Sequence, residues 1–207
     1  MFPLLLFSIL NLTYGAITAL ISQYGYYAIF ALMLLEAAAF PVPSEVVLPA
    51  IGFLAANGTI DPTISFAAVI FGGIIGMAVD YYIAYFLGKD VVYRHLAFFR
   101  IREEQLNAFD EWFAANGAFA VFITRLIPLV RALINFPAGF AQMPIRKFLI
   151  YSIAGTLIWD ALLIGFGYYA LSLSNFYYVM AAIIAFALVL YLVYYFAMKR
   201  IGGRKKR

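Results

Sequence analysis

The 207-residue sequence contains no cysteine, only one histidine and few charged residues. Without cysteine the chain has no disulfide, no thiolate nucleophile and no thiolate metal site. Two common hydrolase signatures, Gly-x-Ser-x-Gly and His-Glu-x-x-His, are also absent. We therefore expect a protein that is not an enzyme and that has no catalytic residue, no metal site and no cofactor.

Charge is scarce and unevenly placed, since charged residues make up 12% of the chain and hydrophobic residues 66%. The mean hydropathy of +0.96 is far above that of a soluble domain. The basic surplus behind the net charge of +4 falls in residues 199–207, so it indicates an anchor facing anionic lipid and no nucleic-acid surface. We expect a multi-pass protein of the cell (plasma) membrane with a cytoplasmic C-terminus. The first apolar run has no basic residues before it, so we expect no cleaved signal peptide.

The order of apolar and charged segments predicts a single all-α membrane domain, residues 1–207. The N-terminal helix is apolar and either spans the bilayer or lies at its interface. Two interrupted apolar regions of similar organisation follow it. The predicted parts are an N-terminal helix (1–24), a first repeat (25–88), a cytoplasmic amphipathic segment (89–111), a second repeat (112–170), a last transmembrane helix (175–198) and the basic tail (199–207).

The first repeat opens with an apolar stretch that is too short to cross a membrane. Residues 26–40 would cover about 22 Å as a helix, whereas the hydrocarbon core is roughly 30 Å thick. Pro41 and Pro43 stop this helix, and a second short apolar piece follows at residues 46–56. Two half-length helices around a proline turn predict a re-entrant hairpin, which enters and leaves the membrane by one face. Residues 63–88 are then long enough to span.

The second repeat has the same organisation. Residues 112–143 are apolar but are interrupted by Pro128 and, further on, by Pro137 and Gly139. Proline removes a backbone donor and clashes with the preceding turn, so we expect breaks at these positions. Residues 148–170 are then long enough to span. With all basic stretches on the cytoplasmic side, this hairpin enters from the cytoplasm and the first hairpin enters from outside.

The two halves also resemble each other in sequence. Gly25-Tyr-Tyr-Ala-Ile-Phe-Ala opens the first hairpin, and the similar Gly117-Ala-Phe-Ala-Val-Phe-Ile opens the second. Residues 76–88 of one spanning segment likewise resemble residues 155–167 of the other. Two units that enter from opposite faces form an inverted repeat, which in secondary transporters places the binding site near the membrane midplane.

Ionisable residues inside the apolar segments are the candidate site, because a charge near the bilayer centre costs roughly 2.5–3.5 kcal/mol on insertion scales. Arginine is effectively never deprotonated, so each buried guanidinium needs an anionic partner. If the hairpins meet tip to tip, the glutamates of the first face the arginines of the second. We expect the arginines to bind the phosphate of a lipid, and the glutamates to replace it when it is absent. The six residues are Glu36, Glu45, Asp80, Arg125, Arg131 and Asp160.

The four carboxylates are predicted to act in proton coupling or gating. Burial disfavours the charged form of a carboxyl group and a nearby guanidinium favours it, so a ligand that displaces the arginine from Glu36 would drive proton uptake. Asp80 and Asp160 lie near the middle of their segments, where helix packing and gating explain them equally well. A structural alternative stays open, in which the ions only hold the two hairpins together. Buried ion pairs are weak stabilisers, which counts against that alternative.

These residues resemble the DedA family, also called the SNARE-associated or VTT-domain family. The resemblance covers roughly residues 20–170 and is strongest in the block Phe122-Ile-Thr-Arg125-Leu-Ile-Pro128-Leu-Val-Arg131, followed by Ala138-Gly139. The other matching positions are Glu36, Phe40-Pro41-Val42-Pro43-Ser44-Glu45, Gly76 to Asp80, Tyr82, Gly88, Met143, Phe148 and Trp159.

The resemblance implies two oppositely facing re-entrant hairpins and a role in moving lipids across the bilayer. Bacterial members are implicated in recycling undecaprenyl phosphate and in envelope integrity that depends on the proton-motive force, and eukaryotic relatives are similar to scramblases. The family's functional acids correspond to Glu36 and Glu45, and its functional arginines to Arg125 and Arg131. In some members the second acid is an aspartate after Pro-Gly, whereas here Glu45 follows Pro-Ser.

The function expected from residues and resemblance together is that of a proton-coupled flippase for a polyprenyl phosphate or a related anionic phospholipid. Its partners would be membrane lipid and protons, and the sequence leaves a homo-oligomer open. Two other functions fit the same residues. An energy-independent phospholipid scramblase would show no response to a pH gradient, and a proton-coupled ion or small-solute transporter would show electrogenic flux without lipid.

Overall fold

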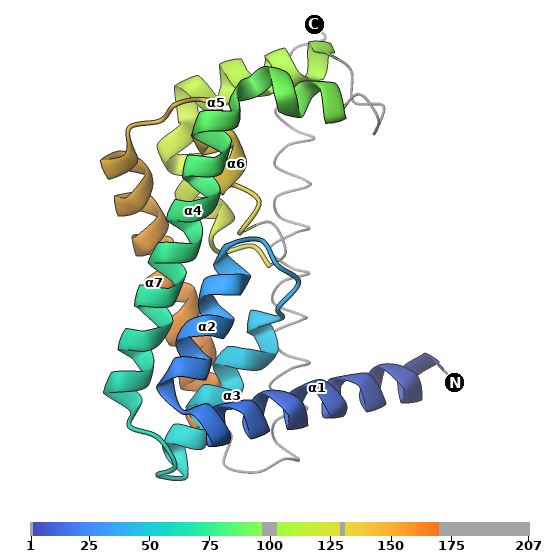
Figure 1. The fold of residues 1–207 in the computed structure, drawn as a ribbon, viewed down its shortest axis with the longest axis vertical. Coiled ribbons are helices and arrows are strands. Elements are labelled where there is room, and N and C mark those ends of the chain that lie inside the picture. Colours follow the sequence, from blue (N-terminus) through green and yellow to red (C-terminus); the bar gives the residue numbers. More distant parts are fainter. Residues whose placement is uncertain (1, 97–102, 129–130, 170–207) are drawn as a thin grey trace, which may run out of the picture.

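The structure, a computed structural model, describes residues 2–96, 103–128 and 131–169, which are helical with short connections and contain no strand. The predicted last transmembrane helix and basic tail lie outside these residues. Figure 1 shows the arrangement of the helices. In chain order they are α1 (Phe2–Tyr24), α2 (Tyr26–Ala37), α3 (Ser44–Ala56), α4 (Pro62–Leu96), α5 (Glu103–Thr124), α6 (Asn135–Phe140) and α7 (Ile145–Tyr169).

The two long helices α4 and α7 run along the long axis of the molecule (Figure 1). Among the described residues they are the two helices long and apolar enough to cross a membrane: Pro62–Gly88 has 27 residues and a mean hydropathy of 1.9, and α7 has 25 residues and 1.8. Their outward faces are apolar. Along α4, for example, exposed Phe71, Ile75 and Val79 follow one another at helical spacing. An exposed stripe of this kind suits contact with lipid.

The start of α4 and the bend near its C-terminal end are each explained by residues at those positions. Asp61 accepts hydrogen bonds at Oδ1 from the backbone N–H groups of Thr63 (2.8 Å) and Ile64 (2.9 Å), which makes it the N-cap of α4, and Pro62 is the first residue of the helix. At the other end α4 bends at Gly88. The φ of 72° and ψ of 169° at this residue are readily adopted only by glycine.

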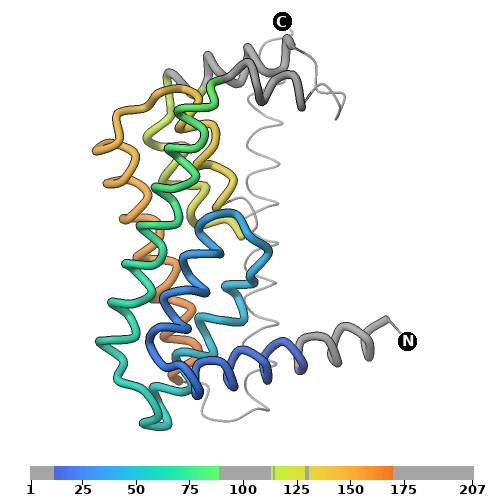
Figure 2. Tube along the Cα trace, in the orientation of Figure 1, coloured from blue at the N-terminus to red at the C-terminus, as the bar shows by residue number. Residues whose placement is uncertain are grey.

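The short helices are shared between the two long ones. α2 and α3 lie in one half of the molecule along its axis, and the end of α5 and α6 lie in the other half (Figure 2). α2 packs on α4 and its neighbour α3 packs on α7, while α5 packs on α7 and α6 packs on α4. Each long helix therefore packs mainly on one member of each pair. α1 crosses the direction of α4 and α7 at one end of the molecule (Figure 1).

Three of the predicted helix breaks fall between helices and two do not. Pro41 and Pro43 lie in the connection between α2 and α3, and Pro128 lies in the irregular segment between α5 and α6. The prediction of breaks at Pro137 and Gly139 is wrong, because both residues lie within α6. Proline is tolerated in the first turn of a helix, where its missing N–H would have no intrahelical acceptor.

The start of the second repeat also differs from the prediction. Its expected first residue, Trp112, lies inside α5, which begins at Glu103 and continues to Thr124. The mixed charge of residues 103–111 marked them as a separate segment, but charged residues such as Glu103 are good helix formers and the helix continues through them.

Glycines allow the helices to approach until their backbones touch. A Cβ added at Gly76 of α4 would lie 2.8 Å from Cβ of Ala37 in α2, and one added at Gly139 of α6 would lie 2.6 Å from Cβ of Ala84 in α4. Gly139 therefore serves close packing. In contrast, an added Cβ at Gly73, also in α4, would meet no atom within 4 Å.

Substitution of these two glycines of α4 should have opposite effects on stability. Gly76→Ala should lower the free energy of unfolding by about 1–3 kcal/mol, because the methyl group forces α2 and α4 apart. Gly73→Ala is the matched control and should raise it by roughly 0.5–1 kcal/mol through helix propensity. Thermal unfolding of the two purified variants in one detergent measures the difference, and equal transition temperatures would contradict the packing described.

The buried apolar residues form two separate clusters along the axis. The first includes Met33, Ile51 and Trp159, and the second includes Met77 and Phe148. Residues of α4 and α7 contribute to both clusters, so the long helices join the two halves. Where the halves meet, the structure places a set of buried polar side chains, namely Glu36, Asp80, Arg125, Arg131, Asn135, Ser152, Thr156 and Asp160.

Candidate functional site

Arg131 lies at the centre of these buried polar side chains. It belongs to the irregular segment after α5 and is 4% exposed. Its Nε donates to Oε1 of Glu36 at 2.7 Å and its Nη2 donates to Oε2 at 2.8 Å. Glu36 lies in the last turn of α2, so this pair joins the tips of the two halves. Two parallel bonds between guanidinium and carboxylate form the strong bidentate geometry that arginine adopts with carboxylate and phosphate alike.

A second carboxylate shares the same guanidinium. Nη1 of Arg131 donates to Oδ1 of Asp160 in α7 at 3.2 Å. Asp160 is completely buried, and its other oxygen, Oδ2, has no hydrogen-bond partner among the described residues. One arginine therefore holds two carboxylates from two helices, and the pair with Glu36 has the better geometry.

Arg125 has a different environment, in which its hydrogen-bond acceptors are neutral. Its Nη2 donates to Oδ1 of Asn135 at 2.5 Å and to Oγ of Ser152 at 3.1 Å. The guanidinium carbon lies 5.8 Å from the centre of the Phe148 ring, within the range of a cation–π contact. Close packing of Gly155 of α7 against the Arg125 side chain holds it in place, since an added Cβ there would lie 2.6 Å from Arg125 Cβ.

Asn135 connects the two halves a second time. Its side-chain amide is fully buried and donates from Nδ2 to the backbone oxygen of Ala37 at 2.9 Å and to Oδ2 of Asp80 at 3.2 Å. Together with its bond from Arg125 it links α2, α4 and α6 to the segment that follows α5. Asn135 and Ser152 are not among the site residues predicted from the sequence. An uncharged amide inside an apolar run was a usable signal, because a buried polar group needs partners.

A pocket of about 280 Å³ opens beside Arg131. Glu36 and Arg131 form its charged wall, and half-buried Glu45 also lines it. Arg125 does not reach this pocket, which distinguishes the two arginines that the sequence treats alike. The described residues that line it are Glu36, Ala39, Phe40, Pro41, Val42, Pro43, Ser44, Glu45, Arg131, Ala132 and Leu133.

The predicted site residues thus come together only in part. The expected contact between the first acid and an arginine occurs as the pair Glu36–Arg131. Asp160 joins that pair, while Asp80 reaches Arg125 only through Asn135. In this arrangement three buried carboxylates face two guanidiniums, so the site carries a surplus of negative charge if all five groups are ionised.

Comparison with known proteins gives a consistent set of relatives. The family model described as the VTT domain matches residues 42–169. Undecaprenyl phosphate transporter A of Staphylococcus aureus is 33% identical over 92% of this chain and 97% of its own length. An alkaline phosphatase-like protein of Lactococcus lactis is 31% identical over 73% of each chain, and protein DedA of Escherichia coli is 28% identical over 72% of each. No solved structure matches.

Proposed function

Because this chain belongs to the VTT-domain (DedA) family of membrane proteins, we propose that it is a flippase for a polyprenyl phosphate or a related anionic phospholipid, coupled to protons. One observation carries the proposal: the buried guanidinium of Arg131 lines an open pocket and is held there by carboxylates that a phosphate can replace. The relative that aligns over nearly the whole chain is named for undecaprenyl phosphate, which supports this choice of lipid.

The phosphate would take the place of Glu36 on Arg131. Two phosphate oxygens match the fork of Nε and Nη2 as well as a carboxylate does. The pocket volume of about 280 Å³ suits a headgroup and not a lipid tail, and side chains such as Val42 and Leu133 make much of its wall apolar. The tail would therefore stay in the membrane while the charged group enters the protein.

The lengths of α2 and α3 support the first re-entrant hairpin in this mechanism, and the packing of the helices supports the second. α2 and α3 have 12 and 13 residues, or about 20 Å each, which is short of a hydrocarbon core roughly 30 Å thick. The crossed packing, in which each long helix holds one arm of each hairpin, supports the inverted repeat. If the first hairpin enters from outside and the second from the cytoplasm, α1 lies along the external membrane surface.

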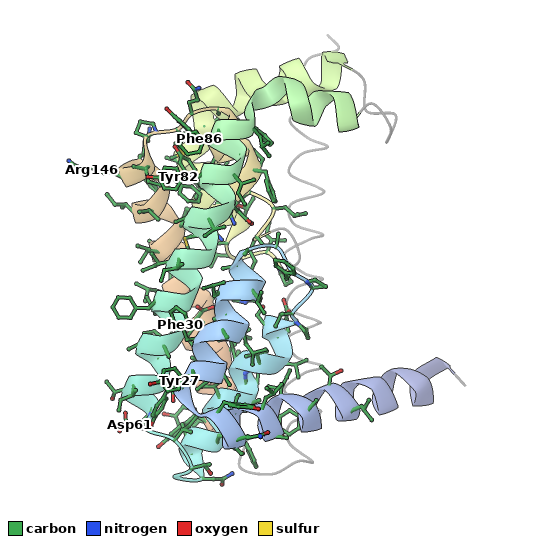
Figure 3. The ribbon with its side chains drawn as sticks, in the orientation of Figure 1. Tyr27, Phe30, Asp61, Tyr82, Phe86 and Arg146 are labelled. Carbon is green, nitrogen blue, oxygen red and sulfur yellow. The ribbon has the colours of Figure 1, made fainter. Side chains whose placement is uncertain are left out.

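Polar and aromatic side chains support the position of the two membrane surfaces. Tyr27 and Asp61 lie toward one end of the long axis, and Phe86 and Arg146 lie toward the other (Figure 3). Aromatic rings and charged groups of this kind gather at membrane interfaces, and basic residues favour the cytoplasmic side. The end with Arg146 would then face the cytoplasm, with the C-terminus on the same side.

Transport is proposed in preference to hydrolysis, although two relatives are named alkaline phosphatase-like. The transporter name belongs to a relative that covers more of the chain. The groups around the pocket can also hold a phosphate and exchange it for a carboxylate without breaking a bond, which is the chemistry that transport requires.

Reconstitution in liposomes tests the proposed function. Purified protein is inserted into vesicles that contain labelled polyprenyl phosphate, with labelled bulk phospholipid in a parallel sample, and lipid movement is followed with and without a pH gradient. We expect movement of the polyprenyl phosphate that is faster with the gradient. Movement of neither lipid, or equal movement of both lipids with no effect of the gradient, would contradict the proposal.

Filling the pocket should stop lipid movement without disturbing the ion pairs. Ala132 lines the pocket next to Arg131, and Ala132→Trp places an indole ring in the space that the headgroup would occupy. We expect at least a tenfold lower rate, which corresponds to about 1.4 kcal/mol. Ala115→Trp is the matched control, since exposed Ala115 lines a separate cavity of about 480 Å³. An unchanged rate in Ala132→Trp would show that the headgroup does not use this pocket.

A further inference from the structure

Asp160 is the ionisable group whose negative charge has the least support in the structure. It is 0% exposed, accepts one bond of 3.2 Å from Arg131 at Oδ1, and has no partner at Oδ2. Glu36, which shares the same guanidinium, receives two bonds of 2.7 and 2.8 Å and lines the pocket. Burial without hydrogen bonds disfavours an ionised carboxylate, so of the two acids on Arg131 a proton belongs on Asp160.

The other charges around Asp160 lead to the same assignment. Arg131 is the cation in contact with it, and Glu36 faces it across that guanidinium. Of the other charges nearby, Arg125, which directly follows α5, is bound to Asn135 and Ser152. Glu45 of α3 lines the pocket without reaching Asp160. Asp80 of α4 is bound to Asn135. Arg131 is thus the one cation in contact with Asp160 among the described residues, and Glu36 already neutralises it.

A line of polar groups connects Asp160 with the other half of the molecule. Thr156 and Ser152 precede it by one and two helical turns on the same face of α7, and both are buried. Ser152 contacts Arg125 through its hydroxyl. The face of α7 that runs from Asp160 toward the other half is therefore polar, and its hydroxyl groups can both donate and accept hydrogen bonds.

We propose that Asp160, and not Glu36, holds the proton that is exchanged during lipid movement. The proton binds at Oδ2, while Oδ1 continues to accept from Arg131. With Asp160 neutral, Arg131 and Glu36 balance each other, and an incoming phosphate meets one negative charge fewer at this guanidinium. With Asp160 ionised, the same phosphate meets a site that is already negative. Lipid entry therefore requires the proton, and loss of the proton favours release. This inference rests on the proposed function, since it assigns the coupling step to one residue.

Transport by carboxamide variants tests the assignment. Asp160→Asn keeps an oxygen for Arg131 but holds no exchangeable proton, so we expect lipid movement to continue and its response to a pH gradient to disappear. Asp61→Asn is the matched control, the same change at the exposed N-cap of the other long helix, where asparagine caps equally well, and it should respond to the gradient like the wild type. A normal gradient response in Asp160→Asn would overturn the inference. Wild-type protein that moves no lipid would instead overturn the proposed function.

A spectroscopic measurement separates the two claims further. Infrared difference spectra of the protein in lipid, recorded as the pH is changed, detect a protonated carboxyl group without any transport. We expect a carboxyl band that is present in the wild type, in Glu36→Gln and in Asp80→Asn, and that is lost in Asp160→Asn. Loss of the band in Glu36→Gln with its retention in Asp160→Asn would assign the proton to Glu36 and overturn the inference even if lipid movement is normal.

Discussion

Arg131→Ala should abolish lipid movement and lower the free energy of unfolding by about 3–5 kcal/mol. The substitution removes three hydrogen bonds and leaves Glu36 and Asp160 buried without their cation. Two carboxylates in this setting either take up protons or draw water into the interior, and both cost stability. Lipid movement in liposomes and thermal unfolding in detergent measure the two effects.

Two further variants give this prediction its controls. Arg131→Lys keeps the charge but cannot form the bidentate pair with Glu36, so we expect intermediate stability and slow lipid movement. Arg146→Ala removes an exposed arginine of α7 and should change stability by less than about 0.5 kcal/mol. If Arg131→Ala behaves like Arg146→Ala in both measurements, the buried ion pair has neither the structural nor the transport role argued above.

A double substitution tests whether the pair Glu36–Arg131 is a phosphate-binding site or only holds the two halves of the protein together. In Arg131→Met combined with Glu36→Met, both members of the bidentate pair become apolar side chains of similar length, and Asp160 needs no cation when it is protonated. Such replacements are often neutral or stabilising, so we expect stability to return toward that of the wild type. Lipid movement should remain absent, because no guanidinium lines the pocket. A double variant that moves lipid normally would establish the structural alternative.

Local features of the fold could be read from the sequence because their causes lie within a few residues. Asp61 caps the helix that Pro62 begins, and the prolines at 41 and 43 separate two short helices whatever else surrounds them. Pro137 failed as a break for a reason that is equally local. A helix can begin two residues before a proline, but sequence alone does not tell where the first turn lies.

The partners in the site could be predicted only where charge leaves no choice. A buried glutamate and a buried arginine each need an oppositely charged partner, and Glu36 and Arg131 pair across 95 residues of sequence. The amide of Asn135 inside an apolar run marks it as a buried polar residue but does not identify its partners, because an amide can bind donors and acceptors of many kinds. Its contacts with Ala37 and Asp80 depend on how closely α6 approaches α2 and α4. Glycines permit this close approach, but their presence in the sequence does not predict it.

Asn135 is the residue for which the structure predicts an effect that the sequence does not. In Asn135→Leu the volume is nearly kept, but Arg125 and Asp80 lose a hydrogen bond each and the last turn of α2 loses the donor at Ala37. Unsatisfied buried groups cost roughly 1–3 kcal/mol each and more when they are charged, so we expect a loss of about 3 kcal/mol or more in the free energy of unfolding.

The matched control for Asn135→Leu is Asn57→Leu, the same change at an exposed position in the turn after α3. It should alter stability by less than about 0.5 kcal/mol. Thermal unfolding compares the two variants, and liposome assays follow lipid movement in the same samples. Because Asn135 joins the tip of the first pair of helices to Arg125, its loss should also slow lipid movement in protein that is still folded. Equal stability of the two variants would mean that the tips are held together by Glu36 and Arg131 alone.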